Sequence, residues 1–319
     1  MKYNRVGRAG VKVSALSLGS WLTYGTDIGD KDSKSIIDAA YDAGINSFDT
    51  ANAYNSGAAE EVLGRALKGR KRDSLVIATK AYFSMGEGPN DSGLSRKHIT
   101  EQVHASLKRL DMDYVDIFYC HRYDENTPIE ETVRAIDDLI RQGKILYAGV
   151  SEWTAKQISE ALAAEERYLL DRIVVNQPSF NLLNRYIEKE VLPFCREKGI
   201  GQIVYSPLAQ GLLTGKYKRN QPAPAGSRGA DKNLGQFLHS EYMAFDRNFD
   251  KLEAIEKVSA EAGIPMNHLA LAWILSVPGI SSAIVGASRL EQLLDNLKAV
   301  DVCLAPDVLE ALDQASPVE

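Results

Sequence analysis

Residues 115–151 read VDIFYCHRYDENTPIEETVRAIDDLIRQGKILYAGVS and hold two short apolar runs on either side of a longer amphipathic run. The middle segment, Pro128–Gln142, repeats isoleucine and valine every three to four residues and is followed by Gly143. This pattern predicts a helix with proline in its first turn and glycine at its end. The flanking runs, Val115–Cys120 and Ile145–Ser151, are almost entirely apolar, as are strands that a parallel sheet buries on both faces. The stretch is therefore predicted to form a strand–helix–strand unit.

The same alternation runs along most of the chain. Eight strands are predicted, at Ser14–Gly19, Ile45–Thr50, Leu75–Lys80, Val115–Cys120, Ile145–Ser151, Ile173–Gln177, Gln202–Ser206 and Ala283–Gly286. Helical spacing is found at Ser33–Ala43, Ser95–Arg109, Pro128–Gln142, Thr154–Ala164, Ile187–Lys198 and Leu290–Val300. Eight such units in series predict an α/β fold, a (β/α)8 TIM barrel that forms a single domain over residues 1–319. The alternative is an open doubly wound sheet, but the segment after the first strand, WLTYGTDIGD (21–30), lacks the glycine-rich phosphate loop that such a sheet usually carries.

Two segments depart from this repeat. Residues 3–13 (YNRVGRAGVKV) are predicted to form an N-terminal β-hairpin that turns at Arg8–Gly10 and closes the bottom of the barrel. Residues 209–250 form a long loop after the seventh strand, rich in Gly, Pro, Lys and Arg. A loop of this length in a compact domain is usually functional or mobile.

Composition excludes several classes of protein. A chain of 319 residues with 45% hydrophobic and 25% charged residues is neither disordered nor fibrous. Its net charge of -6 repels nucleic acids and anionic membranes, and no apolar run reaches the roughly 20 residues of a membrane span. We expect neither a nucleic-acid partner nor membrane insertion. The N-terminus has no signal-peptide pattern, and three cysteines, too few and odd in number for a disulfide framework, suit a cytoplasmic location. The five histidines show no metal-ligand spacing, so no metal is predicted.

Polar side chains stand where neighbouring strands end, which is the edge of a barrel that carries chemistry. Asp49, Lys80 and His121 end or follow the second, third and fourth strands, and Tyr54 lies five residues beyond Asp49. Each of these residue types is common in a purely structural role. The convergence of an acid, a tyrosine, a lysine and a histidine on one rim is what predicts a site.

This set has a chemical logic. A tyrosine phenol has an ordinary pKa of about 10, and a nearby ammonium lowers it by stabilising the phenolate. A carboxylate keeps that ammonium charged and in place, and a neutral imidazole donates to an oxygen beside the phenol. Together they form a proton donor for an alkoxide that develops from a carbonyl. None of the four is a reducing agent, so a hydride source must bind.

These residues resemble the catalytic tetrad of the aldo-keto reductase superfamily. The segments concerned are FDTANAY (48–54), VIATK (76–80) and IFYCHRYD (117–124). The resemblance continues through GVSEW (149–153), VNQPSFN (175–181), YSPLAQGLLTGKY (205–217) and VGASRLEQLLDN (285–296) and covers nearly the whole chain. It is greatest to the branch that is similar to voltage-gated potassium channel β-subunits, of which GPNDSGLSRKHI (88–99) and TPIEETVRAI (127–136) are typical.

The resemblance implies an NADP-dependent oxidoreductase that reduces aldehydes, and ketones as a second class, to alcohols. Tyr54 is implied as the proton donor, Lys80 as the residue that tunes it, Asp49 as the partner of Lys80, and His121 as the residue that orients the carbonyl. The substrate is expected to be a small carbonyl compound, in a pocket lined by Trp21, Tyr54, Tyr82 and His121.

The resemblance also implies a set of residues that bind NADPH or NADP⁺. Ser151 and Gln177 match the residues that hold the nicotinamide carboxamide, although Glu152 stands where many members have Asn, which leaves that contact open. Ser288 is equally expected as the N-cap of the last barrel helix. The complete expected set is Gly19, Ser20, Trp21, Asp49, Ser151, Gln177, Tyr205, Ser206, Pro207, Leu208, Gln210, Lys216, Arg228, Gly286, Ser288, Arg289, Gln292 and Asn296.

Two rival functions stay open. Lys80 is also placed as the Schiff-base lysine of a barrel aldolase. The second rival is a redox-sensing regulatory subunit of a channel-like partner. The resemblance to the channel-subunit branch also implies a homo-tetramer or larger homo-oligomer. The complete tetrad favours an enzyme.

Overall fold

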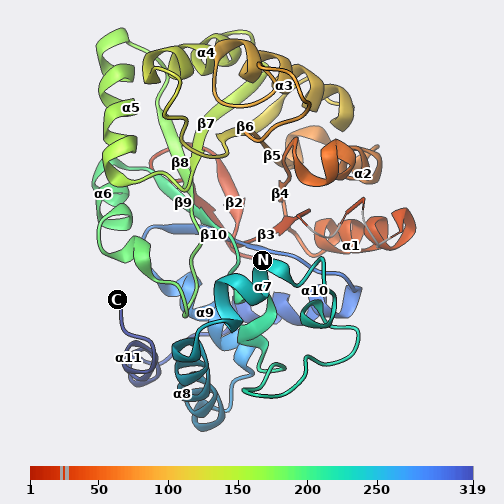
Figure 1. Cartoon of the computed structure of the whole chain (residues 1–319), viewed down its shortest axis with the longest axis vertical. Coiled ribbons are helices and arrows are strands. Elements are labelled where there is room, and N and C mark those ends of the chain that lie inside the picture. Colours follow the sequence, from red (N-terminus) through yellow and green to blue (C-terminus); the bar gives the residue numbers. More distant parts are fainter. Residues whose placement is uncertain (22–23, 26–28, 319) are drawn as a thin grey trace.

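Eight parallel strands form a closed barrel at the centre of the molecule (Figure 1). The computed structural model describes residues 1–21, 24–25 and 29–318. Around the barrel the strands follow the order β10-β3-β4-β5-β6-β7-β8-β9. They are β3 (Leu16–Gly19), β4 (Ser47–Asp49), β5 (Val76–Ala81), β6 (Val115–Cys120), β7 (Ile145–Ser151), β8 (Ile173–Gln177), β9 (Gly201–Val204) and β10 (Ile280–Val285). The predicted TIM barrel is confirmed.

Helices lie around the outside of the strands, and α11 packs beside α8 near the C-terminus (Figure 1). They are α1 (Asp30–Asp42), α2 (Ala58–Leu67), α3 (Arg96–Leu110), α4 (Ile129–Arg141), α5 (Ala155–Tyr168), α6 (Val191–Lys198), α7 (Gln236–Leu238), α8 (Asp246–Ala262), α9 (Met266–Ser276), α10 (Leu290–Leu297) and α11 (Pro306–Ala315). Side chains fix several starts. Ser95 accepts a hydrogen bond from the His98 N–H, and Thr154 forms a capping box with Gln157. The helices α2, α7, α8, α9 and α11 are additional to those predicted.

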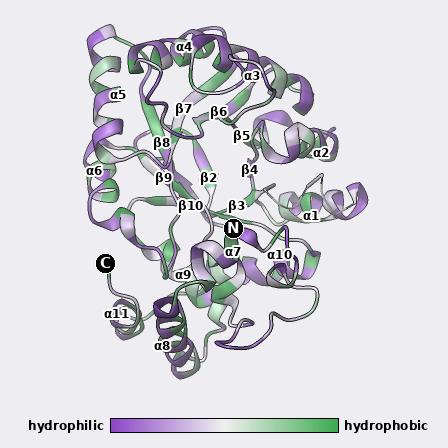
Figure 2. Ribbon diagram, in the orientation of Figure 1, coloured by the Kyte–Doolittle hydropathy of each residue, from purple (hydrophilic) through white to green (hydrophobic). Residues whose placement is uncertain are grey.

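Alternate strand residues face opposite sides of the barrel wall. In β5, Val76 and Ala78 pack inside the barrel, whereas Ile77 and Ala81 join the layer under the helices. The hydropathy colouring shows this layered arrangement, with hydrophobic strands at the centre and hydrophilic outer faces on helices such as α4 and α5 (Figure 2). Because side chains along a strand alternate with a period of two, Lys80 shares the inner face with Val76 and Ala78.

The N-terminal hairpin closes the barrel at the amino ends of the strands, as predicted. Strands β1 (Tyr3–Arg5) and β2 (Lys12–Ser14) pair antiparallel, and the Val6 N–H donates to the Val11 carbonyl across the turn. The fully buried side chains of Val6 and Val13 pack against inward-facing residues of the barrel. The hairpin therefore supplies the apolar floor of the interior, and the opposite end stays available for polar residues.

The predicted long loop, residues 209–250, contains several short helical turns. These are η4 (Ala209–Thr214), η5 (Arg228–Ala230), α7, the π-helical turn η6 (His239–Met243) and the start of α8. Leu212, Tyr217, Leu238 and Tyr242 are buried in the core. Burial of these apolar side chains explains why the segment is folded despite its glycines and prolines.

One buried carboxyl group lies apart from the carboxyl-end rim. Glu165 of α5 is 1% exposed, and its two oxygens lie 3.2 and 3.3 Å from the Ile173 nitrogen, which donates to them. Burial raises the pKa of Glu165 to about 8, and the charges of Asp137 and Asp171 act in the same direction. The folded chain therefore holds this proton more tightly than the unfolded chain, in which a glutamate titrates at about 4.3.

We predict that Glu165 makes folding stability fall as the pH rises. The protonated form is the stable one, so the loss runs from about pH 5 to 8 at roughly 1.4 kcal/mol for each pH unit. Glu165→Gln keeps an acceptor for the Ile173 N–H and should flatten this decline in urea unfolding curves. Glu166→Gln, the same change on the exposed neighbouring residue, should keep it. An unchanged decline in Glu165→Gln would contradict the assignment.

Candidate active site

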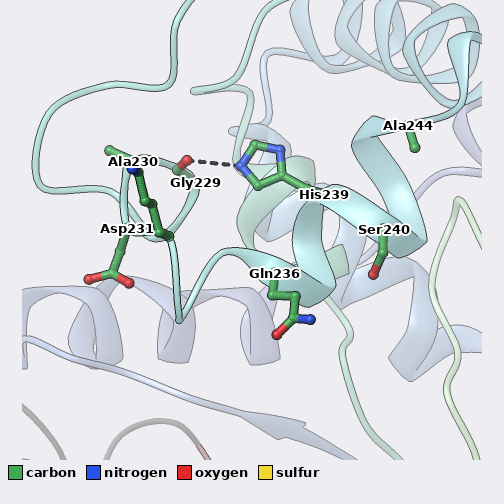
Figure 3. Close-up of a pocket in the computed structure, with 8 residues that line it drawn as sticks. Gly229, Ala230, Asp231, Gln236, His239, Ser240 and Ala244 are labelled. Atoms are coloured by element: carbon green, nitrogen blue, oxygen red, sulfur yellow. Dashed lines mark hydrogen bonds between the residues drawn. The ribbon is translucent and has the colours of Figure 1, made fainter.

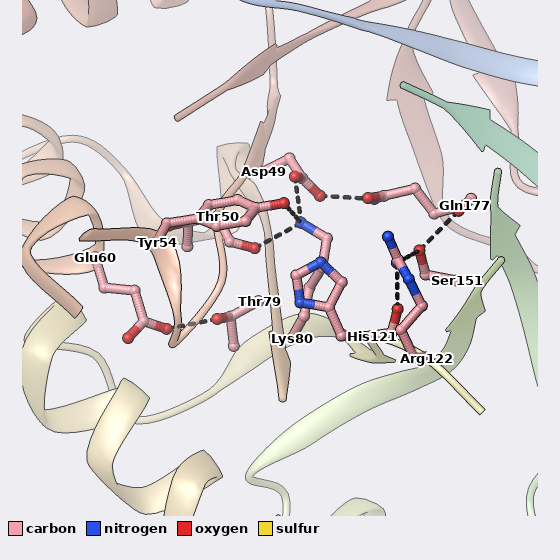
Figure 4. A network of polar contacts seen from close by, with 10 residues as sticks. All are labelled: Asp49, Thr50, Tyr54, Glu60, Thr79, Lys80, His121, Arg122, Ser151 and Gln177. Carbon is pink, nitrogen blue, oxygen red and sulfur yellow. Dashed lines mark hydrogen bonds and ion pairs between the residues drawn. The ribbon is translucent and has the colours of Figure 1, made fainter. Parts of the chain in front are cut away.

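Four barrel strands each contribute one inward-facing polar residue at the carboxyl end (Figure 4). Asp49 ends β4, Lys80 is the penultimate residue of β5, Ser151 ends β7 and Gln177 ends β8. In the barrel register Ser151 is paired with Gln177. The four side chains meet because the period of two turns each of them inward at the same end of the barrel.

Lys80 is the centre of this group and has no exposed surface. Its Nζ donates to Asp49 Oδ1 at 2.5 Å, to the Thr50 carbonyl at 2.8 Å and to Tyr54 Oη at 3.2 Å. Burial lowers the pKa of Lys80, and the Asp49 carboxylate opposes that shift. Three oxygen acceptors match the three protons of an ammonium, so this arrangement holds Lys80 in one orientation.

Asp49 connects Lys80 to the far side of the rim. Its second oxygen, Oδ2, accepts a hydrogen bond from Gln177 Nε2 at 2.7 Å. Ser151 Oγ in turn donates to the backbone carbonyl of Gln177 at 2.8 Å. The sequence-predicted residues Asp49, Lys80, Ser151 and Gln177 therefore form one continuous polar chain across the barrel mouth.

Tyr54 begins η1 (Tyr54–Gly57), directly after β4, and its hydroxyl reaches Lys80. Burial raises the pKa of Tyr54 well above its ordinary value, and the Asp49 carboxylate raises it further. The expected net lowering of this pKa is therefore not found, because burial and the Asp49 carboxylate outweigh the one opposing charge, that of Arg122. Tyr54 therefore keeps its proton at neutral pH, as a proton donor must before it reacts.

His121 follows β6 and packs its ring edge-on against Tyr54, with centroids 5.7 Å apart, and against Phe83 at 4.8 Å. Burial lowers the pKa of His121 well below its ordinary value, and the charges of Lys80 and Arg122 add to this effect. The imidazole is therefore neutral. Its Nδ1 is buried and has no hydrogen-bond partner among the described residues. Buried nitrogens are normally paired, so the described residues leave one hydrogen-bonding position of this imidazole unused.

Aromatic rings stand around the phenol and the imidazole. Trp21 lies 6.5 Å from Tyr54 and 5.3 Å from Phe237 between ring centroids. Tyr82 packs against Phe83 at 5.4 Å, so it lies one ring away from His121. Phe237, which comes from α7 in the long loop, was missed by sequence analysis, since only the fold brings that segment to Trp21.

The segment after β9 has an unusual backbone. Ser206, Ala209 and Gln210 have positive φ angles of 52°, 45° and 56°, which non-glycine residues adopt at an energetic cost and often at functional sites. Arg228 Nη1 donates to Gln210 Oε1 at 3.4 Å, and a Cβ added at Gly211 would lie 3.3 Å from Lys216 Nζ. Lys216 and Arg228 therefore converge on this turn from the long loop.

Arg228 makes no ion pair with any residue that the structure describes. It is only partly exposed, and burial lowers its pKa. A cation that is partly withdrawn from water and lacks an anion suits a negatively charged group of a ligand.

Four residues of the expected cofactor-binding set lie between the turn before α10 and its last turn, namely Ser288, Arg289, Gln292 and Asn296. The backbone N–H and the hydroxyl of Ser288 both donate to Gln292 Oε1, at 3.0 and 3.1 Å. The predicted N-cap is wrong by one residue, because Arg289 occupies that position and Ser288 bonds to the Gln292 side chain instead. Asn296 is buried and accepts from Asn267 Nδ2 at 3.1 Å.

The remaining predicted residues flank the same end of the barrel. Gly19 ends β3, and the hydroxyl of the adjacent Ser20 is buried without a partner in the described part of the chain. Tyr205 and Leu208 are partly buried, Pro207 is buried and Gly286 is exposed.

Glu152, the departure from the family pattern, has a left-handed backbone with φ of 59°. Its carboxylate accepts from the Ser179 N–H at 2.6 Å and from Tyr186 Oη at 2.6 Å. The carboxylate is therefore fixed by the loop after β8.

Two further groups were missed by sequence analysis. Glu60 of α2 is buried and accepts from Thr79 Oγ1 of β5 at 2.5 Å and from Arg109 Nε of α3 at 2.6 Å (Figure 4). Arg122 directly follows His121 and donates to the His121 carbonyl at 2.6 Å. From sequence alone, a charged residue after a strand end, such as Arg122, is expected to be exposed to solvent. The sequence around Glu60 likewise contains no pattern that predicts its burial.

A surface pocket lies in the long loop, between η5 and the turns α7 and η6 (Figure 3). Gly229, Asp231 and Gln236 line it, and His239 Nε2 is hydrogen-bonded to the Gly229 carbonyl at 3.0 Å. It contains none of the polar residues at the strand ends, so it does not belong to the rim.

Within residues 1–21, 24–25 and 29–318, no helix is both long enough and apolar enough to cross a lipid bilayer. No three of the His, Cys, Asp and Glu side chains there are arranged to hold a metal ion.

Comparison with known proteins adds independent information. A model of the aldo/keto reductase family matches residues 15–317. A rice (Oryza sativa subsp. japonica) protein named "Probable voltage-gated potassium channel subunit beta" is 44% identical over 99% of this chain and 98% of its own length. The Arabidopsis thaliana protein of the same name is 46% identical over 98% and 96%. A Schizosaccharomyces pombe protein named "Putative voltage-gated potassium channel subunit beta" is 43% identical over 97% and 91%.

These matches confirm the resemblance inferred from the sequence motifs. The family model spans nearly the whole barrel, and each relative aligns with this chain over nearly its full length. The chain therefore belongs to the aldo/keto reductase family.

Proposed function

We propose that this protein reduces aldehydes to alcohols with NADPH. Membership of the aldo/keto reductase family makes it an oxidoreductase. The observation that carries the finer proposal is the contact of the Tyr54 hydroxyl with Lys80, at 3.2 Å, beside the neutral ring of His121. A protonated phenol and a neutral imidazole on one rim suit the protonation of a carbonyl oxygen.

In this proposal each rim residue has a separate task. Tyr54 donates its proton as negative charge develops on the carbonyl oxygen, and Lys80 then stabilises the phenolate that remains. Asp49 keeps Lys80 charged and oriented, since it accepts one of its hydrogen bonds at 2.5 Å. His121 donates to the same carbonyl oxygen and so positions the substrate. NADPH, when bound, would supply the hydride.

The residues present fit a dinucleotide. Ser151 and Gln177 offer a hydroxyl and an amide beside Asp49 for the nicotinamide carboxamide. Arg228 lacks an anion and Lys216 lies on the same turn, which suits a pyrophosphate. Arg289 is exposed at the N-terminus of α10 and forms no ion pair in the described part of the chain, which suits the additional phosphate of NADPH.

The direct test is an absorbance screen of NADPH consumption over short, aromatic and dicarbonyl aldehydes, with ketones as a second class. Consumption that depends on both the aldehyde and the enzyme supports the proposal. A folded preparation that binds NADPH but consumes it with none of these compounds would refute the proposal.

A second candidate is a regulatory subunit of a membrane channel, which the names of the relatives favour. In that case the dinucleotide site serves as a redox sensor. The presence of a channel in complexes purified from the native source, without turnover of any aldehyde, would favour this function. A cytosolic location suits either candidate, since all three cysteines are unpaired.

The first prediction from the proposed function concerns Tyr54. General acid catalysis contributes about 10²–10⁴-fold, so Tyr54→Phe should lower kcat by that factor and leave NADPH affinity close to wild type. Tyr168→Phe removes a phenol hydroxyl at the end of α5 and should change neither quantity. Undiminished turnover in Tyr54→Phe would exclude Tyr54 as the donor.

The second prediction separates reduction from Schiff-base chemistry at Lys80. Lys80→Met should abolish reduction, because the phenolate loses its cation. Treatment of the wild-type protein with substrate and borohydride should leave its mass unchanged, since the Lys80 ammonium is held by Asp49. This second measurement does not depend on the folding of the variant. An adduct located on Lys80 would support an aldolase instead.

The third prediction concerns the choice of cofactor. We expect NADPH to bind more tightly than NADH, because Arg289 contacts the additional phosphate. Arg289→Ala should weaken NADPH binding by about ten- to a hundred-fold and barely change NADH binding in fluorescence titrations. Arg167→Ala on α5 is the control for loss of an exposed arginine. Equal losses for both cofactors would show that Arg289 is structural.

A further inference from the structure

Arg122 places a guanidinium at the same rim as Tyr54 and His121. It follows His121 at the end of β6, and its Nη1 donates to the His121 carbonyl at 2.6 Å and lies 3.5 Å from Ser151 Oγ (Figure 4). The guanidinium also lies over the ring of Phe83, 5.6 Å from its centroid. These contacts hold the charge beside the imidazole and the polar chain of the barrel mouth.

The charge of Arg122 has no neutralising partner within the described residues. No carboxylate among them forms an ion pair with Arg122. Two carboxylates at this end of the barrel have other partners. Asp49 accepts hydrogen bonds from Lys80 and Gln177. Glu152 accepts hydrogen bonds from Ser179 and Tyr186. The positive charge of Arg122 nevertheless acts on its neighbours at the rim, because it contributes to the lowered pKa of His121.

Part of the guanidinium is free to bind a ligand. Within the described residues only Nη1 donates hydrogen bonds to the protein, and the side chain is only partly exposed. A planar guanidinium with unused N–H groups binds a carboxylate through two parallel hydrogen bonds. Lys80 is already bonded to three oxygens, so beside Tyr54 and His121 it is Arg122 that has unused donors, and one cation suits a monoanion better than a dianionic phosphate.

We propose that Arg122 selects carbonyl substrates that carry a carboxylate. This inference rests on the proposed reduction of aldehydes. Because Arg122 donates to the His121 carbonyl and both side chains pack against Phe83, the carboxylate and the reacting carbonyl belong to one short molecule, an oxo-acid with few carbons between the two groups.

A matched pair of substrates tests this proposal. 4-Oxobutanoate and its methyl ester share the aldehyde and the chain length and differ in the charge. The wild type should prefer the acid in kcat/KM, and Arg122→Met should lower the acid-to-ester ratio by about ten- to a hundred-fold. Arg122→Lys keeps a charge without the planar fork and should retain part of the preference. Arg134→Met on α4 makes the same change away from the rim and should leave the ratio unchanged.

The ratio separates selection from a general effect on catalysis. An unchanged ratio in Arg122→Met, or a wild type without preference for the acid, would overturn the proposal. An equal loss for both substrates together with weaker NADPH binding would mean that Arg122 serves the cofactor, which also overturns it.

A binding experiment keeps this inference distinct from the proposed function. Calorimetric titration of the NADP⁺-loaded protein with 4-hydroxybutanoate and with 1,4-butanediol needs no turnover. Arg122→Met should weaken binding of the acid and not of the diol. If no aldehyde is reduced at all, the proposed function fails, whereas the titration still decides whether Arg122 binds a carboxylate.

Discussion

The ammonium of Lys80, which has no exposed surface, constrains the whole carboxyl end of the barrel. A buried charge is costly unless it is paired and fully hydrogen-bonded. Asp49, the Thr50 carbonyl and Tyr54 supply the three acceptors, and all come from β4 and the chain that follows it. The pairing of β4 with β5, in which Asp49 is opposite Ala78, brings them together. The contact that would tune a proton donor is therefore also what makes burial of Lys80 tolerable.

A second polar network fixes the other face of the same strand. Thr79, next to Lys80, points outward and donates to the buried carboxylate of Glu60, which also binds Arg109. Because α2 follows η1 directly, this network ties the helix after Tyr54 to β5 from outside the barrel. Loss of one partner from such a buried pair is strongly destabilising, typically by about 3–5 kcal/mol. The position of the phenol is thus determined from both sides of the barrel wall.

The strands and helices with a regular spacing of apolar residues were predictable from the sequence. The polar rim at the carboxyl ends of the strands was predictable for the same reason, because side chains alternate along a strand. Lys80, Ser151 and Gln177 meet because inward alternation and a common strand end are sequence properties. The helix α2 was not predicted, because Glu60 is a buried acid and Gly64 packs against the Leu110 backbone, so its pattern is not that of an amphipathic helix. The upward shift of the Tyr54 pKa was also missed, since desolvation depends on packing that a list of neighbouring charges does not contain.

Glu152 shows how a departure from a family pattern can be accommodated by its surroundings. A left-handed backbone suits Asn better than Glu, and it costs a non-glycine residue about 1–3 kcal/mol unless the structure enforces it. Two charge-assisted hydrogen bonds, from the Ser179 N–H and the Tyr186 hydroxyl, offset that cost. They also direct the carboxylate toward the loop after β8, which leaves Arg122 unneutralised. The substitution that removes an amide donor from the expected carboxamide contact therefore also leaves a positive charge at the rim, where the substrate would bind.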